Sequence, residues 1–181
     1  MLLGTATIVK PDGTTGRITI LIDTGANQTV ITESASDRFG LQLGGTAKNI
    51  SMGTASGTVT VETFRCPVTL KTDTDEIKDI VATSMPCVWP EFTRIRPTKE
   101  DVRFLASKGL RLSETNEELR KNRGFDMIIG TDLRTIFSTF ELPSGLDAYH
   151  TPFGVLLGGR KYKKAYRAPA KKRRLGHSRR S

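Results

Sequence analysis

The chain has 181 residues, with 28 Lys and Arg against 19 Asp and Glu, and a net charge of +9. This length predicts one globular domain with an extension. Charges, glycines, prolines and threonines interrupt every apolar run before it reaches the roughly 20 residues of a membrane helix, which excludes a membrane-spanning protein. Two histidines and two cysteines are too few for a His-rich zinc site or a disulfide framework, so we expect no metal and no other cofactor.

The positive charge is concentrated at the C-terminal end of the chain. Residues 160–181 contain eleven Lys and Arg and no acid, which leaves 17 basic and 19 acidic residues in 1–159. A segment with so little apolar surface cannot offset the entropy of ordering. The sequence therefore predicts a folded domain over 1–159 and a basic disordered tail over 160–181.

The N-terminal half has the pattern of an all-β fold, because β-branched residues cluster between turn residues. Pro11-Asp12-Gly13 predicts a tight reversal between the first two strands. A short helix is expected at Glu33–Phe39, with Thr32 as its N-cap and Gly40 at its end. The strands are expected at Gly4–Lys10, Gly16–Ile22, Gln28–Thr32, Ala47–Met52, Thr58–Lys71 and Ile77–Met85.

The C-terminal half begins with a charged segment. Residues 90–123 carry both signs of charge and irregularly spaced leucines, which predicts an insertion with one or two short helices. A buried strand is expected at Phe125–Gly130 and a short helix at Thr131–Phe137, with Asp132 as the cap of that helix. Strands at Phe137–Leu142 and Gly154–Leu157 are expected to complete the domain.

The most informative residues follow the second expected strand. Asp23-Thr24-Gly25-Ala26 directly follows the apolar run Ile20–Ile22. A carboxylate at the end of a buried strand is either hydrogen-bonded or functional, because burial disfavours its charged form. Gly25 permits a sharp turn there, and Thr24 supplies a hydroxyl group to neighbouring backbone.

This loop resembles the active-site loop of retropepsin-like aspartic proteases, and Ile128-Ile129-Gly130 resembles the second signature of that family. Within that family, the sequence resembles the peptidase domain of BEL/Pao-type retrotransposons. That finer resemblance is carried by Leu3-Gly4-Thr5-Ala6, by Gly109–Ser113 ahead of Asp126–Asp132, and by Thr151–Gly159. It implies an all-β, retropepsin-like closed β-barrel with one or two short helices and a helical insertion.

The resemblance also implies a mechanism. Peptide hydrolysis without a metal or a nucleophilic side chain needs one carboxylate that activates water and a second acid that protonates the carbonyl oxygen. The chain has one Asp-Thr-Gly motif, so each protomer would supply half a site. A twofold homodimer would then bring two copies of Asp23 together over a polypeptide substrate, and the pair would titrate as a unit.

The resemblance gives roles to further residues. Thr24, Gly25, Ala26, Ile128, Ile129 and Gly130 would support the active-site loop. A hairpin containing Met52, Gly53 and Gly57 would be a mobile flap over substrate, whereas without the resemblance it reads as an ordinary surface hairpin.

The tail leaves several interpretations open. It could be an inert solvated extension, a site for nucleic acid through phosphate contacts, or a remnant of the next segment of a polyprotein. Lys171, Lys172, Arg173 and Arg174 could form a nuclear localisation signal. With no apparent secretion signal, we expect an intracellular location, cytoplasmic or nuclear.

Two functional hypotheses follow. The first is a retrotransposon-derived aspartic endopeptidase. The second is a catalytically inactive, domesticated dimerisation module whose basic tail binds nucleic acid or a partner.

Overall fold

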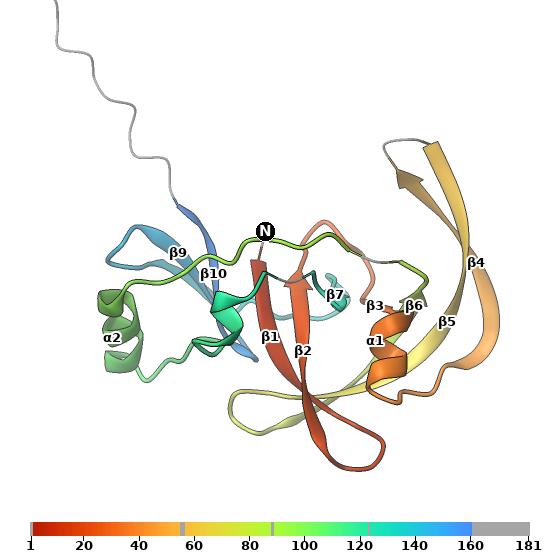
Figure 1. The fold of residues 1–181 in the computed structure, drawn as a ribbon, viewed down its shortest axis with the longest axis horizontal. Coiled ribbons are helices and arrows are strands. Elements are labelled where there is room, and N and C mark those ends of the chain that lie inside the picture. The colour runs from red at the N-terminus through yellow and green to blue at the C-terminus, as the bar shows by residue number, and fades with distance from the viewer. Residues whose placement is uncertain (1, 55–56, 88, 123, 161–181) are drawn as a thin grey trace, which may run out of the picture.

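The structure is a computed structural model that describes residues 2–54, 57–87, 89–122 and 124–160 (Figure 1). The described part is mostly β, as the sequence predicts. Its strands are β1 (Leu2–Val9), β2 (Thr15–Ile22), β3 (Val30–Thr32), β4 (Gly44–Thr54), β5 (Gly57–Lys71), β6 (Ile77–Met85), β7 (Met127–Ile129), β8 (Ser138–Glu141), β9 (Leu146–Thr151) and β10 (Gly154–Arg160).

Six strands form a closed barrel. They follow the order β5–β6–β3–β7–β2–β1, and β1 pairs back onto β5, with Ile8 opposite Leu70. The apolar face of every strand points inward, and side chains such as Ile8, Ile20, Ile31 and Ile129 are completely buried. The closed barrel expected from the sequence is thus present, and it leaves these six strands with few open edges.

The hairpin that opens the barrel has the predicted turn. Lys10 and Thr14 are joined by a backbone hydrogen bond of 2.8 Å, and Gly13 adopts a positive φ of 81° that glycine tolerates without strain. β1 and β2 then pair in register from Val9 opposite Thr15 to Leu2 opposite Ile22. The Asp-Thr-Gly sequence therefore starts where a fully paired strand ends.

A second sheet segment extends the barrel beyond β1. β10 pairs with β1 at Leu157 and Leu3, and β9 and β8 follow it to the sheet edge. The sequence does not predict β9, because Leu146–Thr151 mixes apolar residues with Asp147, Tyr149 and His150. Its alternating residues Leu146 and Ala148 are buried in a separate apolar cluster with Leu105 of the insertion.

The short helices agree only in part with the expectation. α1 (Glu33–Arg38) begins where predicted, since the Thr32 hydroxyl accepts a hydrogen bond from the Ala35 amide, and Gly40 follows it with a φ of 65°. The helix expected at Thr131–Phe137 is wrong: this segment is a turn followed by chain without regular secondary structure. The Thr131 amide donates instead to the Ala26 carbonyl at 2.8 Å, so a contact across the fold replaces local helical pairing.

The insertion contains two helical segments, as expected: α2 (Lys99–Ser107) and the 3-10 turn η1 (Glu118–Arg120). Thr98 and Asp101 form a reciprocal capping box at the start of α2. The completely buried Asp101 also accepts a hydrogen bond of 3.0 Å from the Ser144 amide. One carboxylate thus attaches α2 to the turn between β8 and β9.

Two carboxylates of the insertion, Asp101 and Glu118, make the stability of the fold depend on pH. Burial alone would raise the pKa of both carboxyl groups. Hydrogen bonds from Thr98 and Ser144 nevertheless hold the pKa of Asp101 below its usual 3.8. Hydrogen bonds from Arg17 and Thr115 hold the pKa of Glu118 below its usual 4.5. A lowered pKa stabilises the fold at pH above these usual values, and that contribution is lost as the pH falls through the folded-state values.

We therefore expect the free energy of unfolding to decrease as the pH drops below about 4. Asp101→Asn should flatten that decrease and lower the stability at neutral pH by about 1–3 kcal/mol. Urea titrations across the acidic range would measure both effects. An unchanged slope in Asp101→Asn would contradict the anchoring role of this carboxylate.

The cysteines, the absence of a membrane-spanning helix and the C-terminal tail are the remaining subjects of the sequence predictions. Cys66 is buried and Cys87 is half-buried, and neither forms a disulfide. No helix in the described ranges is long and apolar enough to span a membrane. Lys171–Arg174 and the rest of 161–181 lie outside the described residues, so the domain boundary at 159 and the roles considered for the tail stay predictions.

Candidate active site

Asp23 lies at the point where two parallel strands end together. The Asp23 amide donates to the Ile129 carbonyl at 3.1 Å, which continues the pairing of β2 with β7 by one residue. The Ala26 amide then donates to the Asp23 carbonyl at 3.2 Å and closes a tight turn. The Gly25 amide donates to Asp23 Oδ1 at 2.8 Å. Three contacts thus fix the carboxylate at the end of the barrel.

Steric contacts explain why residue 130, which is expected to support the Asp-Thr-Gly loop, is a glycine. A Cβ atom at Gly130 would lie 2.7 Å from the carbonyl carbon and oxygen of Gln28 and 2.9 Å from the carbonyl oxygen of Ala26. Contacts this short with backbone cannot be relieved by a side-chain rotation. Only glycine therefore lets the chain after β7 pass directly beside the Asp-Thr-Gly loop.

Asp132 has a role that the sequence does not predict. Its carboxylate accepts two hydrogen bonds from Thr29, from the amide at 2.9 Å and from the hydroxyl at 2.7 Å, so its expected role as a helix cap is wrong. The Thr29 hydroxyl in turn accepts from the Gly130 amide at 3.3 Å. Asp132 thus positions the two loops that meet at Asp23 and does not share the cavity beside Asp23.

That cavity, of about 340 Å³, is open to solvent beside Asp23. Thr24 and Thr131 line it together with Ile22, Leu133, Arg134, Thr135 and Ile136. Asp23 is the one carboxylate among these described lining residues, and Thr24 and Gly25 are exposed. The arrangement provides one acid beside an open surface, which is half of the pair that hydrolysis by two carboxylates requires.

Sequence reasoning missed the segment Leu133–Ile136 as part of this cavity. Its residues were assigned to a helix, where Arg134 would have been an ordinary exposed side chain. In the structure Arg134 lines the same cavity as Asp23. The signal that could have indicated this is the number of β-branched residues in the segment, which disfavours a helix.

The residues expected to support the loop occupy different positions. Ile129 is completely buried in the barrel, whereas the half-buried Ile128 packs on the other side of β7 against Leu3, Leu21 and Phe125. Ala26 is half-buried, and its carbonyl accepts from both the amide and the hydroxyl of Thr131. The supporting role of this group in an active site stays a prediction.

The expected flap is a long antiparallel hairpin of β4 and β5, which extends away from the barrel (Figure 1). Met52 pairs with Val59, Gly53 with Thr58 and Thr54 with Gly57. Gly57 has a φ of 129°, which only glycine adopts readily.

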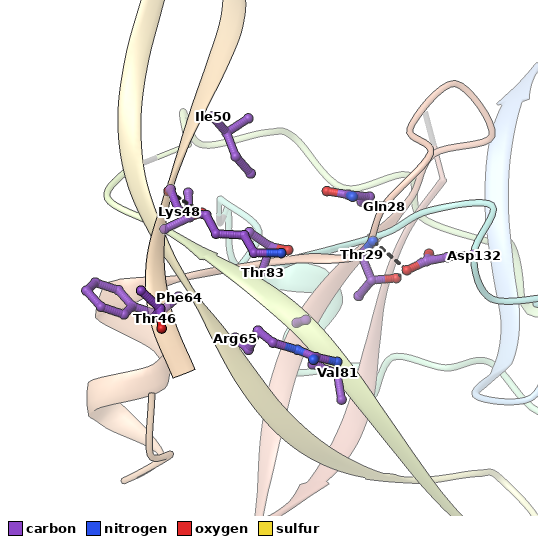
Figure 2. Close-up of a pocket in the computed structure, with 12 residues that line it drawn as sticks. Gln28, Thr29, Thr46, Lys48, Ile50, Phe64, Arg65, Val81, Thr83 and Asp132 are labelled. Atoms are coloured by element: carbon purple, nitrogen blue, oxygen red, sulfur yellow. Dashed lines mark hydrogen bonds between the residues drawn. The ribbon is translucent and has the colours of Figure 1, made fainter. Parts of the chain in front are cut away.

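Part of this hairpin faces Gln28 and Thr29, which follow the Asp-Thr-Gly loop, across a cavity of about 240 Å³. Figure 2 shows Lys48 and Ile50 on the hairpin side and Gln28, Thr29 and Asp132 opposite them. Polar groups line both walls. The backbone of an extended polypeptide carries N–H and C=O groups that need hydrogen-bond partners, and polar walls of this kind can supply them.

A metal site finds no support in the described residues, because none of their His, Cys, Asp and Glu side chains form a group of three that could hold an ion.

Comparison with known proteins gives two similarities and one negative result. Residues 10–90 match the sequence model of a family described as gag-polyprotein putative aspartyl protease. The structure is similar to the EIAV protease complexed with the inhibitor HBY-793, with 25% sequence identity, 46% of this chain and 74% of that chain covered, and a TM-score of 0.34. No curated protein matches the chain. The family match includes Asp23 and the hairpin, and it supports a relation to retropepsin-like aspartic proteases.

Proposed function

We propose that this protein is an aspartic endopeptidase, in which Asp23 of two identical chains forms the catalytic pair. The observation that carries the proposal is the fixed position of Asp23 at the open end of the barrel, held by the Gly25 amide and flanked by the Gly130 backbone. The match of residues 10–90 to an aspartyl protease family supports it independently.

The chemistry follows from the pair. One Asp23 carboxylate, ionised, removes a proton from a water molecule that attacks the peptide carbonyl. The Asp23 of the other protomer, protonated, donates its proton to the carbonyl oxygen as the tetrahedral intermediate forms. The first Asp23 then gives the proton it took from water to the leaving nitrogen, and the second Asp23 takes a proton from a hydroxyl group of the intermediate. The C–N bond breaks, the product carboxyl group forms, and the two Asp23 carboxyl groups again share one proton.

The surrounding residues would serve this reaction in three ways. Thr24, which is exposed, would support the contact between the two loops through its hydroxyl group. Gly25 lets the loops approach closely, since it presents no side chain. The β4–β5 hairpin would close over an extended polypeptide that lies between it and Gln28.

The experiment is incubation of the purified protein with a diverse peptide mixture from acidic to neutral pH, with product peptides identified by mass spectrometry. We expect cleavage with an optimum below neutral pH, because loss of the shared proton removes the general acid. A rate that keeps rising beyond about pH 8 would contradict a shared-proton mechanism.

The absence of any product would favour the other hypothesis, a dimerisation module that has lost catalysis. In that case Asp23→Asn would leave every remaining activity of the protein unchanged.

The proposal extends to the evolutionary origin of the protein. Leu3-Gly4-Thr5-Ala6 in β1, and Thr151–Gly159 at β9 and β10, support descent from a BEL/Pao-type retrotransposon. An intracellular location, cytoplasmic or nuclear, would suit such an origin, and Lys171–Arg174 would be the candidate for a nuclear localisation signal.

A further inference from the structure

The insertion contains a groove whose charged lining is entirely positive. It lies between the start of α2 and the segment around η1, and has a volume of about 480 Å³. Its cationic residues are Arg96, Lys99, Arg103 and Arg120, and no acid is among its described lining residues. Hereafter these four residues define the basic groove. Its floor includes Val102, which is 44% exposed, and Asn116 supplies an amide.

The cations of the basic groove are available to a ligand. Within the described residues, none of the ion pairs involves Lys99, Arg103 or Arg120. Arg96 donates from Nε to the Leu119 carbonyl at 3.3 Å, which holds its side chain against η1.

Nearby acids are already neutralised or face elsewhere. Glu117 pairs with Lys121 at 2.6 Å, and Glu118 pairs with Arg17 at 2.9 Å. Asp101 is completely buried under α2 in its capping box. Glu100 lies on α2 but does not line the groove. The groove therefore concentrates positive potential on a body, residues 1–159, that has more acidic than basic residues.

The segment just before the groove lies near the end of β10. Thr93 and Arg94, just before Arg96, line a small cavity together with Gly159 near the end of β10. The sequence continues from there with the eleven Lys and Arg of residues 160–181.

We propose that the basic groove binds the phosphate backbone of a single nucleic-acid strand. Three of its four cations are arginines, whose planar fork matches phosphate oxygens. Its described lining contains no aromatic ring, so recognition would not depend on base stacking and would be insensitive to base sequence. This site lies outside the Asp23 cavity and does not depend on the protein being a peptidase.

The test uses the full chain and single-stranded oligonucleotides of mixed sequence. Lys99→Glu/Arg103→Glu should weaken binding at low salt by at least about 10-fold. The slope of log K against log salt should become shallower by about 1.4, because two phosphate contacts are lost. The matched control is Lys10→Glu/Lys78→Glu, which removes the same charge from the β1–β2 turn and from β6 and should leave most of the affinity intact. Equal weakening in both double variants would overturn the groove as the site.

A second measurement uses the unsubstituted protein and so does not depend on whether a variant folds. Amine acylation followed by mass spectrometry should show Lys99 protected several-fold by a saturating oligonucleotide, with Lys78 unchanged. Binding without protection of Lys99 would place the nucleic acid on the tail alone and overturn the proposal. Equal protection of Lys99 by an acidic polypeptide such as polyglutamate, at the same concentration, would overturn nucleic acid as the ligand.

Discussion

Asp23→Asn is expected to lower the rate of peptide hydrolysis by about 10³-fold or more, because an amide can neither accept the proton of the attacking water nor supply an acidic proton. The substitution keeps the shape of the side chain. Its carbonyl oxygen can still accept the hydrogen bond that Asp23 Oδ1 receives from the Gly25 amide at 2.8 Å. We therefore expect folding and dimerisation to persist, so that the loss is confined to kcat.

The chain offers a matched control for this substitution. Asp12 Oδ1 accepts from the Thr14 amide at 2.9 Å, which is the same local geometry two residues along the chain, but in an exposed turn. Asp12→Asn should retain full activity. Peptide-cleavage rates of both variants, with dimer content measured in parallel, make the comparison. Hydrolysis by Asp23→Asn at the rate of Asp12→Asn would show that Asp23 is not catalytic.

Gly130→Ala should destabilise the protein by about 1–3 kcal/mol and also reduce activity. The added Cβ would meet the Gln28 backbone at 2.7 Å, and relief of that contact requires the chain after β7 to move away from the Asp23 loop. The hydrogen bond from the Thr131 amide to the Ala26 carbonyl would lengthen with it. Stability and activity should therefore fall together.

Gly44→Ala is the control for this prediction. Gly44 lies at the start of β4, and a Cβ there would have no atom within 4 Å. Urea unfolding should show little change for Gly44→Ala and a clear loss for Gly130→Ala. Equal stability of the two variants would contradict the steric role of Gly130.

The sequence predicted best those features that depend on local chemistry. Ile77–Met85 is a strand with the predicted bounds, and Thr32 caps α1 as expected. Asp23 and Gly130 were identified separately from their motifs, and the parallel pairing of β2 with β7 brings them together. Neighbouring residues determine the strand and the cap, whereas the meeting of Asp23 and Gly130 depends on the pairing of β2 with β7 across the fold.

Features that depend on contacts across the fold were missed. The segment after Gly130 is not a helix, because its polar groups bind Ala26 and Thr29, about a hundred residues earlier in the chain. β9 is a strand because β8 and β10 pair with it on both sides. The basic groove could not be predicted from the sequence, because Arg96 and Arg120 are far apart in the chain and the insertion as a whole carries both signs of charge.

In the proposed mechanism each chain holds half of a catalytic site, so that activity requires a dimer. The most direct test measures peptide-cleavage rate per chain against protein concentration, with sedimentation of the same samples. We predict that the rate per chain rises in proportion to the dimer fraction, and that addition of excess Asp23→Asn protein suppresses it by forming mixed dimers with one functional carboxylate. A rate per chain that stays constant in a sample that sediments only as monomer would contradict the account.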